Sequence, residues 1–132
     1  MDTLVIKHGN LYIDGHFTRA DMRIAGGNIV SLSDCEESGG TVLDAEGKYV
    51  VPGFVDLHAH FREPGFSYKE TIRTGSMAAA AGGYTTVCTM PNLDPVPDSP
   101  AHLQMQLDLI KRDAVIEVLP FASVTVGEKG ET

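Results

Sequence analysis

The sequence has few basic residues and few cysteines, and both shortages exclude classes of protein. Lys and Arg together number 10 against 18 Asp and Glu, so the 132 residues carry a formal net charge of −8 at pH 7. Binding to a nucleic-acid backbone requires clustered Lys and Arg, and we therefore expect no nucleic-acid partner. The only cysteines, Cys35 and Cys88, lie far apart in the sequence, which favours a reducing compartment.

Long apolar segments are also missing. No apolar stretch approaches the roughly 20 residues that cross a bilayer. The first residues, MDTLVIKHG, lack the basic and apolar regions typical of a secretory signal. We therefore expect no membrane association and a cytoplasmic location. No low-complexity run occurs, and 42% of the residues are hydrophobic, as in an ordinary globular protein.

Residues 1–52 have the pattern of a small antiparallel β-layer. Short strand-like runs alternate with turn dipeptides, among them Asp14-Gly15 and Gly26-Gly27. Such dipeptides between strand-like runs are typical of hairpins. The acidic stretch at 34–40 predicts a loop, after which the strand pattern resumes through TVLDA and KYVV. We expect this layer to be part of a small β-sandwich-like domain.

From residue 53 the pattern changes to alternating strands and helices. Strands are predicted at 54–57, 84–90 and 115–122. Between the first two, Ser67 and Glu70 have the spacing of a capping box for a helix that continues through the alanines and stops at Gly82-Gly83. This order of elements indicates a domain boundary near residue 53.

A second helix is predicted between the second and third strands. Ser99 is a capping residue, and Pro100, which follows it, is suited to the first helical turn. Leu103, Leu107 and Ile110 give this helix an apolar stripe.

The resulting βαβαβ order implies parallel strands joined by right-handed crossovers. It fits an open doubly wound sheet or the first strands of a (β/α)8 barrel. No glycine-rich phosphate-binding turn follows the first strand, whereas polar residues follow the first two strands, as in barrel enzymes. We expect an α/β fold in which residues 53–132 are the first units of a TIM-type barrel. A closed barrel takes roughly 250 residues, so we expect the chain to be truncated, the amino-terminal portion of a larger enzyme.

Two histidines stand near the end of the first strand of this second part. Asp56, His58 and His60 alternate with Leu57 and Ala59, so the three polar side chains share one face of a strand. Imidazole is a good zinc ligand, and a catalytic zinc takes about three protein ligands, so the pair supplies most of one site. Asp56 would orient a histidine by hydrogen bonding. The alternative is that both histidines are hydrogen-bonded polar residues without a catalytic role.

Two further polar residues follow the predicted strands. Arg62 can bind a carboxylate through two parallel hydrogen bonds, or it can form a surface ion pair with Glu63. Asn92 can donate to an anion, or it can build a turn after Pro91.

The remaining candidates carry less information. His8, His16 and His102 lack partners at metal-ligand spacing, and we expect them to be surface or cap residues. Cys88 lies inside an apolar strand, where we expect a buried thiol without catalytic activation.

The string PGFVDLHAHFREPG at 52–65 resembles the amidohydrolase superfamily, in particular the cyclic amidohydrolases, which include dihydroorotases, allantoinases and dihydropyrimidinases. The similarity continues through KET at 69–71, GSMAAAAGGYTTV at 75–87 and MPN at 90–92. Dihydropyrimidinases usually lack the arginine of this string, and allantoinases depart from the plain MPN. Arg62 together with Asn92 therefore favours the dihydroorotases.

The resemblance implies that His58 and His60 bind zinc, one or two ions, and that Arg62 and Asn92 hold a substrate carboxylate. The implied reaction is the reversible conversion of dihydroorotate and N-carbamoyl-L-aspartate in pyrimidine biosynthesis. The catalytic acid and the remaining metal ligands would lie beyond residue 132, so we expect this portion to be inactive alone.

Three alternatives stay open beside this interpretation. They are an allantoinase or related cyclic amidohydrolase, a non-catalytic dihydroorotase-like partner of aspartate carbamoyltransferase, and a metal-binding fragment without activity. Retention of both His58 and His60 counts against the non-catalytic partner. Beyond a small-molecule substrate, the partners that the resemblance implies are further copies of the chain or aspartate carbamoyltransferase.

Overall fold

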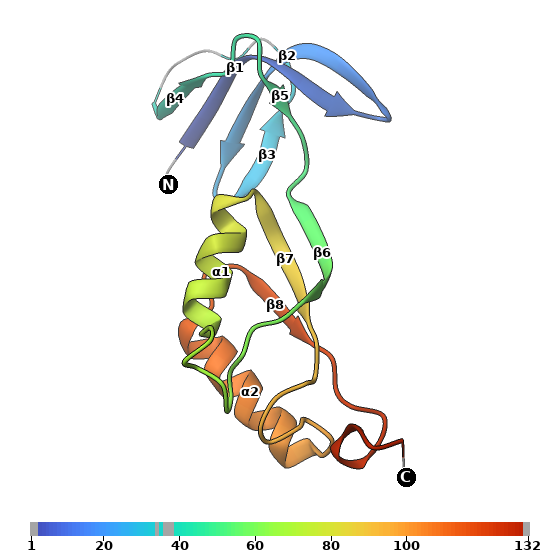
Figure 1. Cartoon of the computed structure of the whole chain (residues 1–132). Helices are drawn as coiled ribbons and strands as arrows, with labels where there is room; N and C mark the ends of the chain where they lie inside the picture. The colour runs from blue at the N-terminus through green and yellow to red at the C-terminus, as the bar shows by residue number, and fades with distance from the viewer. Residues whose placement is uncertain (1–2, 34, 36–38, 131–132) are drawn as a thin grey trace. The chain divides into compact units, whose positions relative to one another are not determined.

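The computed structural model describes residues 3–33, 35 and 39–130. The chain divides into two compact units, Met1–Pro52 and Gly53–Thr132 (Figure 1). The loop predicted at 34–40 lies partly outside the described residues. Among the residues described, no helix combines the length and the apolar character needed to cross a membrane.

The first unit is one five-stranded sheet. Its strands are β1 (Thr3–Ile13), β2 (His16–Ala25), β3 (Asn28–Ser31), β4 (Thr41–Asp44) and β5 (Tyr49–Val50). The sheet order is β3-β2-β1-β4, and β5 pairs with β1. The two predicted hairpins are confirmed, because β1–β2 and β2–β3 are antiparallel. All four turn residues at 14–15 and 26–27 have positive φ, as the tight primed turns require.

The purely antiparallel expectation was wrong for the last two strands. Both β4 and β5 run parallel to β1, so the sheet is mixed. The reason is that β2 already pairs with one edge of β1. After β3 the chain crosses over to the other edge of β1, and such a crossover brings β4 and β5 alongside β1 in the parallel direction. The first strand, β1, is interrupted by a bulge between Ile6 and Gly9.

A buried ion pair stabilises this unit. Lys7 Nζ lies 2.8 Å from Asp21 Oδ2, and the Asp21 carboxylate also accepts hydrogen bonds from the backbone N–H groups of His8 (2.9 Å) and Cys35 (3.1 Å). The hydrogen bond from Lys7, reinforced by the two backbone donors, lowers the pKa of Asp21 to about 2. The buried charge is therefore well satisfied.

The second unit has the predicted βαβαβ order. Its elements are β6 (Phe54–Ala59), α1 (Ile72–Ala81), β7 (Tyr84–Thr89), α2 (Pro100–Asp113) and β8 (Glu117–Pro120), followed by a 3-10 turn at Val126–Glu128. The strands pair in parallel in the order β6-β7-β8. Figure 1 shows both helices along one side of this sheet. Buried side chains between helices and sheet form the core: Phe61, Ile72, Val87 and Val118.

Helix α1 begins later than the capping signal predicted. The cap is Thr71, whose side chain accepts from the Thr74 N–H, while the Thr74 hydroxyl accepts from the Thr71 N–H. The prediction of Ser67 and Glu70 as the capping box was wrong. Residues 67–69 belong to a turn instead, in which the Lys69 N–H donates to the Phe66 carbonyl.

The start of α2 is confirmed, and its apolar stripe is corrected. Ser99 caps the helix by accepting from the His102 N–H, and Pro100 stands in the first turn. Leu107 is exposed, whereas Gln106 is buried and its amide donates to the Thr89 hydroxyl (3.3 Å). The buried face of α2 is therefore centred on Gln106 rather than Leu107.

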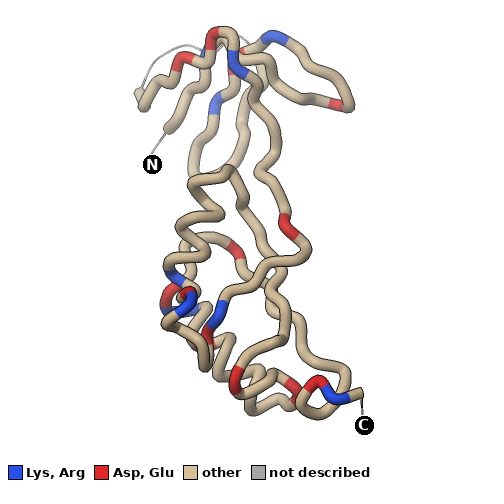
Figure 2. The backbone as a smooth tube through the Cα atoms, viewed as in Figure 1, with Lys and Arg blue, Asp and Glu red and all other residues tan. Residues whose placement is uncertain are grey.

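Charged residues of both signs are interspersed in each unit (Figure 2). Arg19 pairs with Glu46 in the first unit, and Arg112 pairs with its neighbour Asp113 in the second, each at 2.6 Å. The Asp113 partner raises the pKa of Arg112, and the Arg112 hydrogen bond lowers the pKa of Asp113.

Candidate functional site

The two histidine rings come together at the end of β6. His58 lies within the strand and His60 follows its last residue, so their side chains leave the same face. The ring centroids are 5.1 Å apart, with an angle of 69° between the ring planes, and both residues are exposed. The structure thus places two imidazoles side by side with access to a ligand.

Asp56 has a different partner from the one expected. Its Oδ1 accepts a hydrogen bond from the backbone N–H of His58 at 2.9 Å. Within the described part of the chain, no hydrogen bond joins this carboxylate to a histidine ring. Asp56 therefore fixes the main chain that carries His58 rather than the orientation of the imidazole.

Asn92 contacts one of the histidines directly. Its Oδ1 lies 2.9 Å from Nδ1 of His60 in a hydrogen bond. The contact arises because β6 and β7 are neighbours, and the Met90 N–H extends their pairing by donating to the Ala59 carbonyl (2.9 Å). The sequence predicted Asn92 as an anion donor or as a turn residue after Pro91. It did not predict this contact, because the two residues are 32 positions apart.

Arg62 is half-buried and lies two residues after His60 in the loop that follows β6. Among the described residues, its guanidinium has no hydrogen bond or ion pair with a protein group. The surface pair with Glu63 is not formed, because the Glu63 carboxylate accepts instead from the Ile72 N–H at the start of α1 (2.9 Å). The Arg62 donors therefore remain available to an anion.

The loops after β6 and β7 pack tightly against each other. Gly65 has a φ of 96°, and a Cβ at this position would collide with the backbone and side chain of Asp94. The Asp94 N–H also points to the Pro64 carbonyl, at 3.4 Å. A glycine is required here for both its backbone conformation and the close approach. This packing holds the segments that carry Arg62 and Asn92 next to each other.

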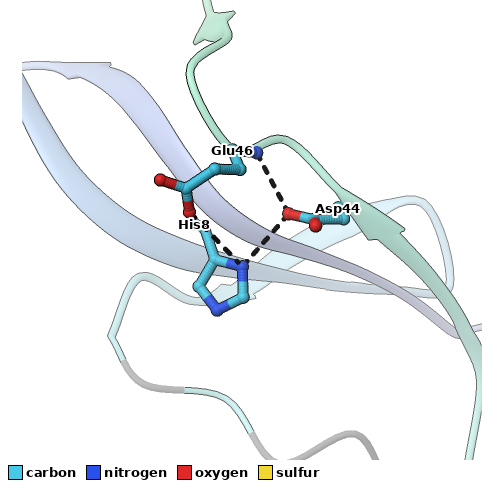
Figure 3. A group of neighbouring side chains, drawn as sticks. All are labelled: His8, Asp44 and Glu46. Carbon is cyan, nitrogen blue, oxygen red and sulfur yellow. Dashed lines mark hydrogen bonds and ion pairs between the residues drawn. The ribbon is translucent and has the colours of Figure 1, made fainter.

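A second group of possible metal ligands lies in the first unit (Figure 3). His8 Nδ1 lies 3.1 Å from Asp44 Oδ1 and 3.9 Å from Glu46 Oε2, and the three ligand atoms all lie within 4.8 Å of one another. All three residues are exposed. The expectation that His8 lacks partners was wrong, since the parallel pairing of β1 and β4 places Asp44 beside it.

The atoms of this second group already have protein partners. Arg19 Nη2 lies 2.6 Å from the same Glu46 oxygen, and the Glu46 N–H donates to Asp44 Oδ1 (3.0 Å). The hydrogen bond with His8 is the largest cause of the lowered pKa of Asp44. His8, Asp44 and Glu46 therefore form a surface network of hydrogen bonds and ion pairs.

The histidine pair at β6 fits a metal better. No hydrogen bond of the His58 ring occurs among the described residues, and the bond of His60 uses only Nδ1, which leaves Nε2. Imidazole nitrogens without a protein partner are suitable zinc ligands.

Comparison with known proteins identifies close relatives. A family described as dihydro-orotase-like matches residues 47–132. Dihydroorotase from Ligilactobacillus salivarius (strain UCC118) is 50% identical over 131 residues, which cover 96% of this chain and 30% of the relative. Dihydroorotase from Staphylococcus aureus (strain Mu50) is 47% identical over 129 residues, with the same coverage of both chains. The chain thus spans about 30% of the length of these curated relatives.

Solved structures of cyclic amidohydrolases share the fold. L-hydantoinase (dihydropyrimidinase) from Arthrobacter aurescens matches 95% of this chain and 28% of its own, with a TM-score of 0.83 and 25% identity. Dihydropyrimidinase from Brevibacillus agri matches 93% of this chain and 27% of its own, with a TM-score of 0.79 and 26% identity. The family match covers more than half of the sequence, and the chain therefore belongs to the dihydroorotase-like family.

Proposed function

We propose that the chain forms the amino-terminal part of a zinc-dependent dihydroorotase, which interconverts dihydroorotate and N-carbamoyl-L-aspartate in pyrimidine biosynthesis. The observation that carries this proposal is the pair of rings of His58 and His60, with Asn92 bonded to His60, at the carboxyl ends of two neighbouring parallel strands. Arg62 follows in the loop after the first of these strands. The dihydroorotase relatives support the substrate class.

His58 and His60 would hold the zinc, as one ion or as part of a two-ion site. A bound zinc would polarise the scissile carbonyl and lower the pKa of a bound water. A catalytic zinc takes about three protein ligands, so at least one more ligand comes from residues other than this pair. A general acid is also needed outside these four residues, and we expect the described portion to lack turnover alone.

Arg62 and Asn92 would bind the substrate carboxylate. The Arg62 guanidinium can form two parallel hydrogen bonds with it, and the Asn92 amide N–H can add a third. This clamp would orient the ring with its amide toward the histidines. In the hydrolytic direction, the oxygen of water bonds to the amide carbon and one proton of the water passes to a general base. The ring C–N bond breaks, and the departing nitrogen takes a proton from the same group, which then acts as general acid.

The fold is consistent with this site. We propose that β6-α1-β7-α2-β8 are the first units of a (β/α)8 barrel, in which active sites lie at the carboxyl ends of the strands. The first unit would be part of a β-sandwich-like domain. Cys35 and Cys88 are both free and buried, which agrees with a reducing cytoplasm.

The test uses the protein that carries this chain, expressed from its complete gene. We expect bound zinc and turnover of dihydroorotate, with far slower turnover of allantoin and of dihydrouracil, which lacks a carboxylate. His58→Ala should remove zinc and turnover, whereas His16→Ala, an exposed histidine of the first unit, should keep both. Preferred turnover of allantoin would replace the proposal with an allantoinase, and zinc-free turnover would reject the metal assignment.

A further inference from the structure

The hydrogen bond between His60 and Asn92 has a defined direction. Nδ1 of His60 and Oδ1 of Asn92 lie 2.9 Å apart. An amide oxygen has lone pairs and no hydrogen, so it can only accept. The hydrogen in this bond therefore belongs to the imidazole, and in the neutral ring the other nitrogen, Nε2, is left with its lone pair.

Asn92 is held in place by the backbone around it. The residue is half-buried, and the Leu93 N–H donates to the Pro91 carbonyl at 2.7 Å, which forms a tight turn over Asn92. Leu93 is buried, and Met90 is paired with the end of β6. The amide is thus fixed by β7 and its following turn, and through Met90 also by the end of β6.

We infer that Asn92 is a positioning residue, which holds His60 as the tautomer protonated on Nδ1 and directs the unprotonated Nε2 away from the protein partner and toward a metal. This inference rests on the proposed function for the metal itself. The tautomer itself follows from the hydrogen bond.

The inference gives Asn92 two simultaneous contacts. Its oxygen accepts from His60, and its amide nitrogen, for which no partner occurs in the described part of the chain, keeps both hydrogens for an anion. One side chain would then connect a metal ligand with the carboxylate site. A free imidazole samples both tautomers, and the asparagine removes that freedom before the metal binds.

Two other histidines provide internal references. His102 Nδ1 lies 2.9 Å from Asp98 Oδ1 and 3.0 Å from the Val96 carbonyl, which are both acceptors, so its Nδ1 must also be protonated. His58 has no ring hydrogen bond among the described residues, and its tautomer is not set by a protein group.

The experiment is long-range proton–nitrogen NMR on the metal-free 132-residue chain with 15N-labelled histidine. It is recorded at about pH 8, above the usual histidine pKa of about 6.5. We expect His60 and His102 to show a protonated Nδ1. Asn92→Ala should give His60 a mixture of tautomers, and Asn92→Asp, which retains the acceptor oxygen, should restore the single one. An unchanged His102 signal reports that each variant is folded.

A His60 ring protonated on Nε2 in the parent chain would overturn the inference, as would an unchanged tautomer in Asn92→Ala.

Zinc affinity and kinetics of the complete enzyme separate this result from the proposed function. Asn92→Ala should weaken zinc binding about 10-fold to 100-fold. Asn92→Asp should keep zinc affinity but raise KM for dihydroorotate, because its charge repels the carboxylate. The NMR result without zinc binding or turnover would reject the proposed function and leave the tautomer assignment intact.

Discussion

Arg62 is the residue whose substitution separates substrate binding from metal binding. The residue is half-buried, and within the described residues its guanidinium has no hydrogen bond or ion pair with a protein group. Lysine would keep the charge but cannot form two parallel hydrogen bonds with a carboxylate. The chemistry of this position therefore depends on the shape of the cation as well as on its charge.

We expect Arg62→Lys in the complete enzyme to raise KM for dihydroorotate about 10-fold to 100-fold. One hydrogen bond to a charged group contributes about 1.5–3 kcal/mol, and about 1.4 kcal/mol corresponds to a factor of ten. Zinc content should not change, because the arginine is not a metal ligand. Arg73→Lys, at an exposed position of α1, is the matched control and should leave KM unaltered. Equal KM values in the parent and Arg62→Lys would refute the role.

Asp21 is the residue on which acid stability of the first unit should depend. Its folded pKa, about 2, lies below the usual value because Lys7 and two backbone N–H groups stabilise the carboxylate. A depressed pKa adds stability that is fully present above the unfolded pKa of about 3.9 and is lost as pH falls toward the folded value. The stability that Asp21 contributes is therefore lost between about pH 4 and about pH 2.

We expect Asp21→Asn to lower the free energy of unfolding at pH 7 by on the order of 3 kcal/mol, because Lys7 loses its buried partner. The difference from the parent, measured by urea denaturation, should shrink between about pH 4 and pH 2. Asp14→Asn is the control: this turn residue is exposed and has a φ of 49°, which asparagine also adopts. If both variants unfold alike, the ion pair contributes nothing measurable.

Among the helices and strands, α1 shows how packing opposes local propensity. Gly75 lies in the interior of this helix, where an alanine in place of glycine would ordinarily stabilise the helix by about 1 kcal/mol. A Cβ at Gly75 would lie 2.5 Å from the ring of Phe61, which is itself in the core. Overpacking of this kind usually costs about 1–3 kcal/mol. The glycine therefore permits the close approach of the helix to the loop after β6.

We expect Gly75→Ala to destabilise the chain by up to about 2 kcal/mol, since the clash outweighs the gain in helix propensity. Ala78→Gly, at an exposed position of the same helix, should cost about 1 kcal/mol from propensity alone. The free energies of unfolding come from urea denaturation. Phe61→Leu should reduce the penalty of Gly75→Ala in the double variant. A more stable Gly75→Ala would contradict the packing of α1 on Phe61.

For the chain as a whole, net charge and exposed apolar surface act against each other. The charge of −8 at pH 7 falls to zero near the pI of about 4.9. Strand β6 forms an edge of the described three-stranded sheet, and large apolar side chains on it are exposed, including Leu57 at 68%. Charge repulsion keeps such surfaces apart, and unpaired strand edges promote association.

We expect light scattering by the chain to rise severalfold as the pH is lowered from about 8 to the pI, where repulsion between molecules vanishes. Leu57→Lys should suppress this rise because it places a charge on the exposed edge strand. Leu107→Lys adds the same charge to an exposed position of α2 and should suppress it less. An equal effect of the two variants would show that net charge, and not the strand edge, controls association.

Much of the fold followed from local patterns. The hairpins at Asp14-Gly15 and Gly26-Gly27, the βαβαβ order and the cap at Ser99 were all predictable, because turn residues and caps act within a few positions. The shared face of His58 and His60 was predictable for the same reason, since a strand repeats every two residues. The family resemblance rested on equally local strings of residues.

Contacts between distant segments could not be inferred in this way. The bond from His60 to Asn92 depends on the register between β6 and β7, and the contact of His8 with Asp44 depends on β4 joining β1 in parallel. The start of α1 at Thr71 was decided by the turn that precedes it. Each outcome is set by which strand edge or helix face is free once the other elements have packed. Covalent geometry thus determined the local shapes, and competition for hydrogen bonds and buried surface decided how they combine.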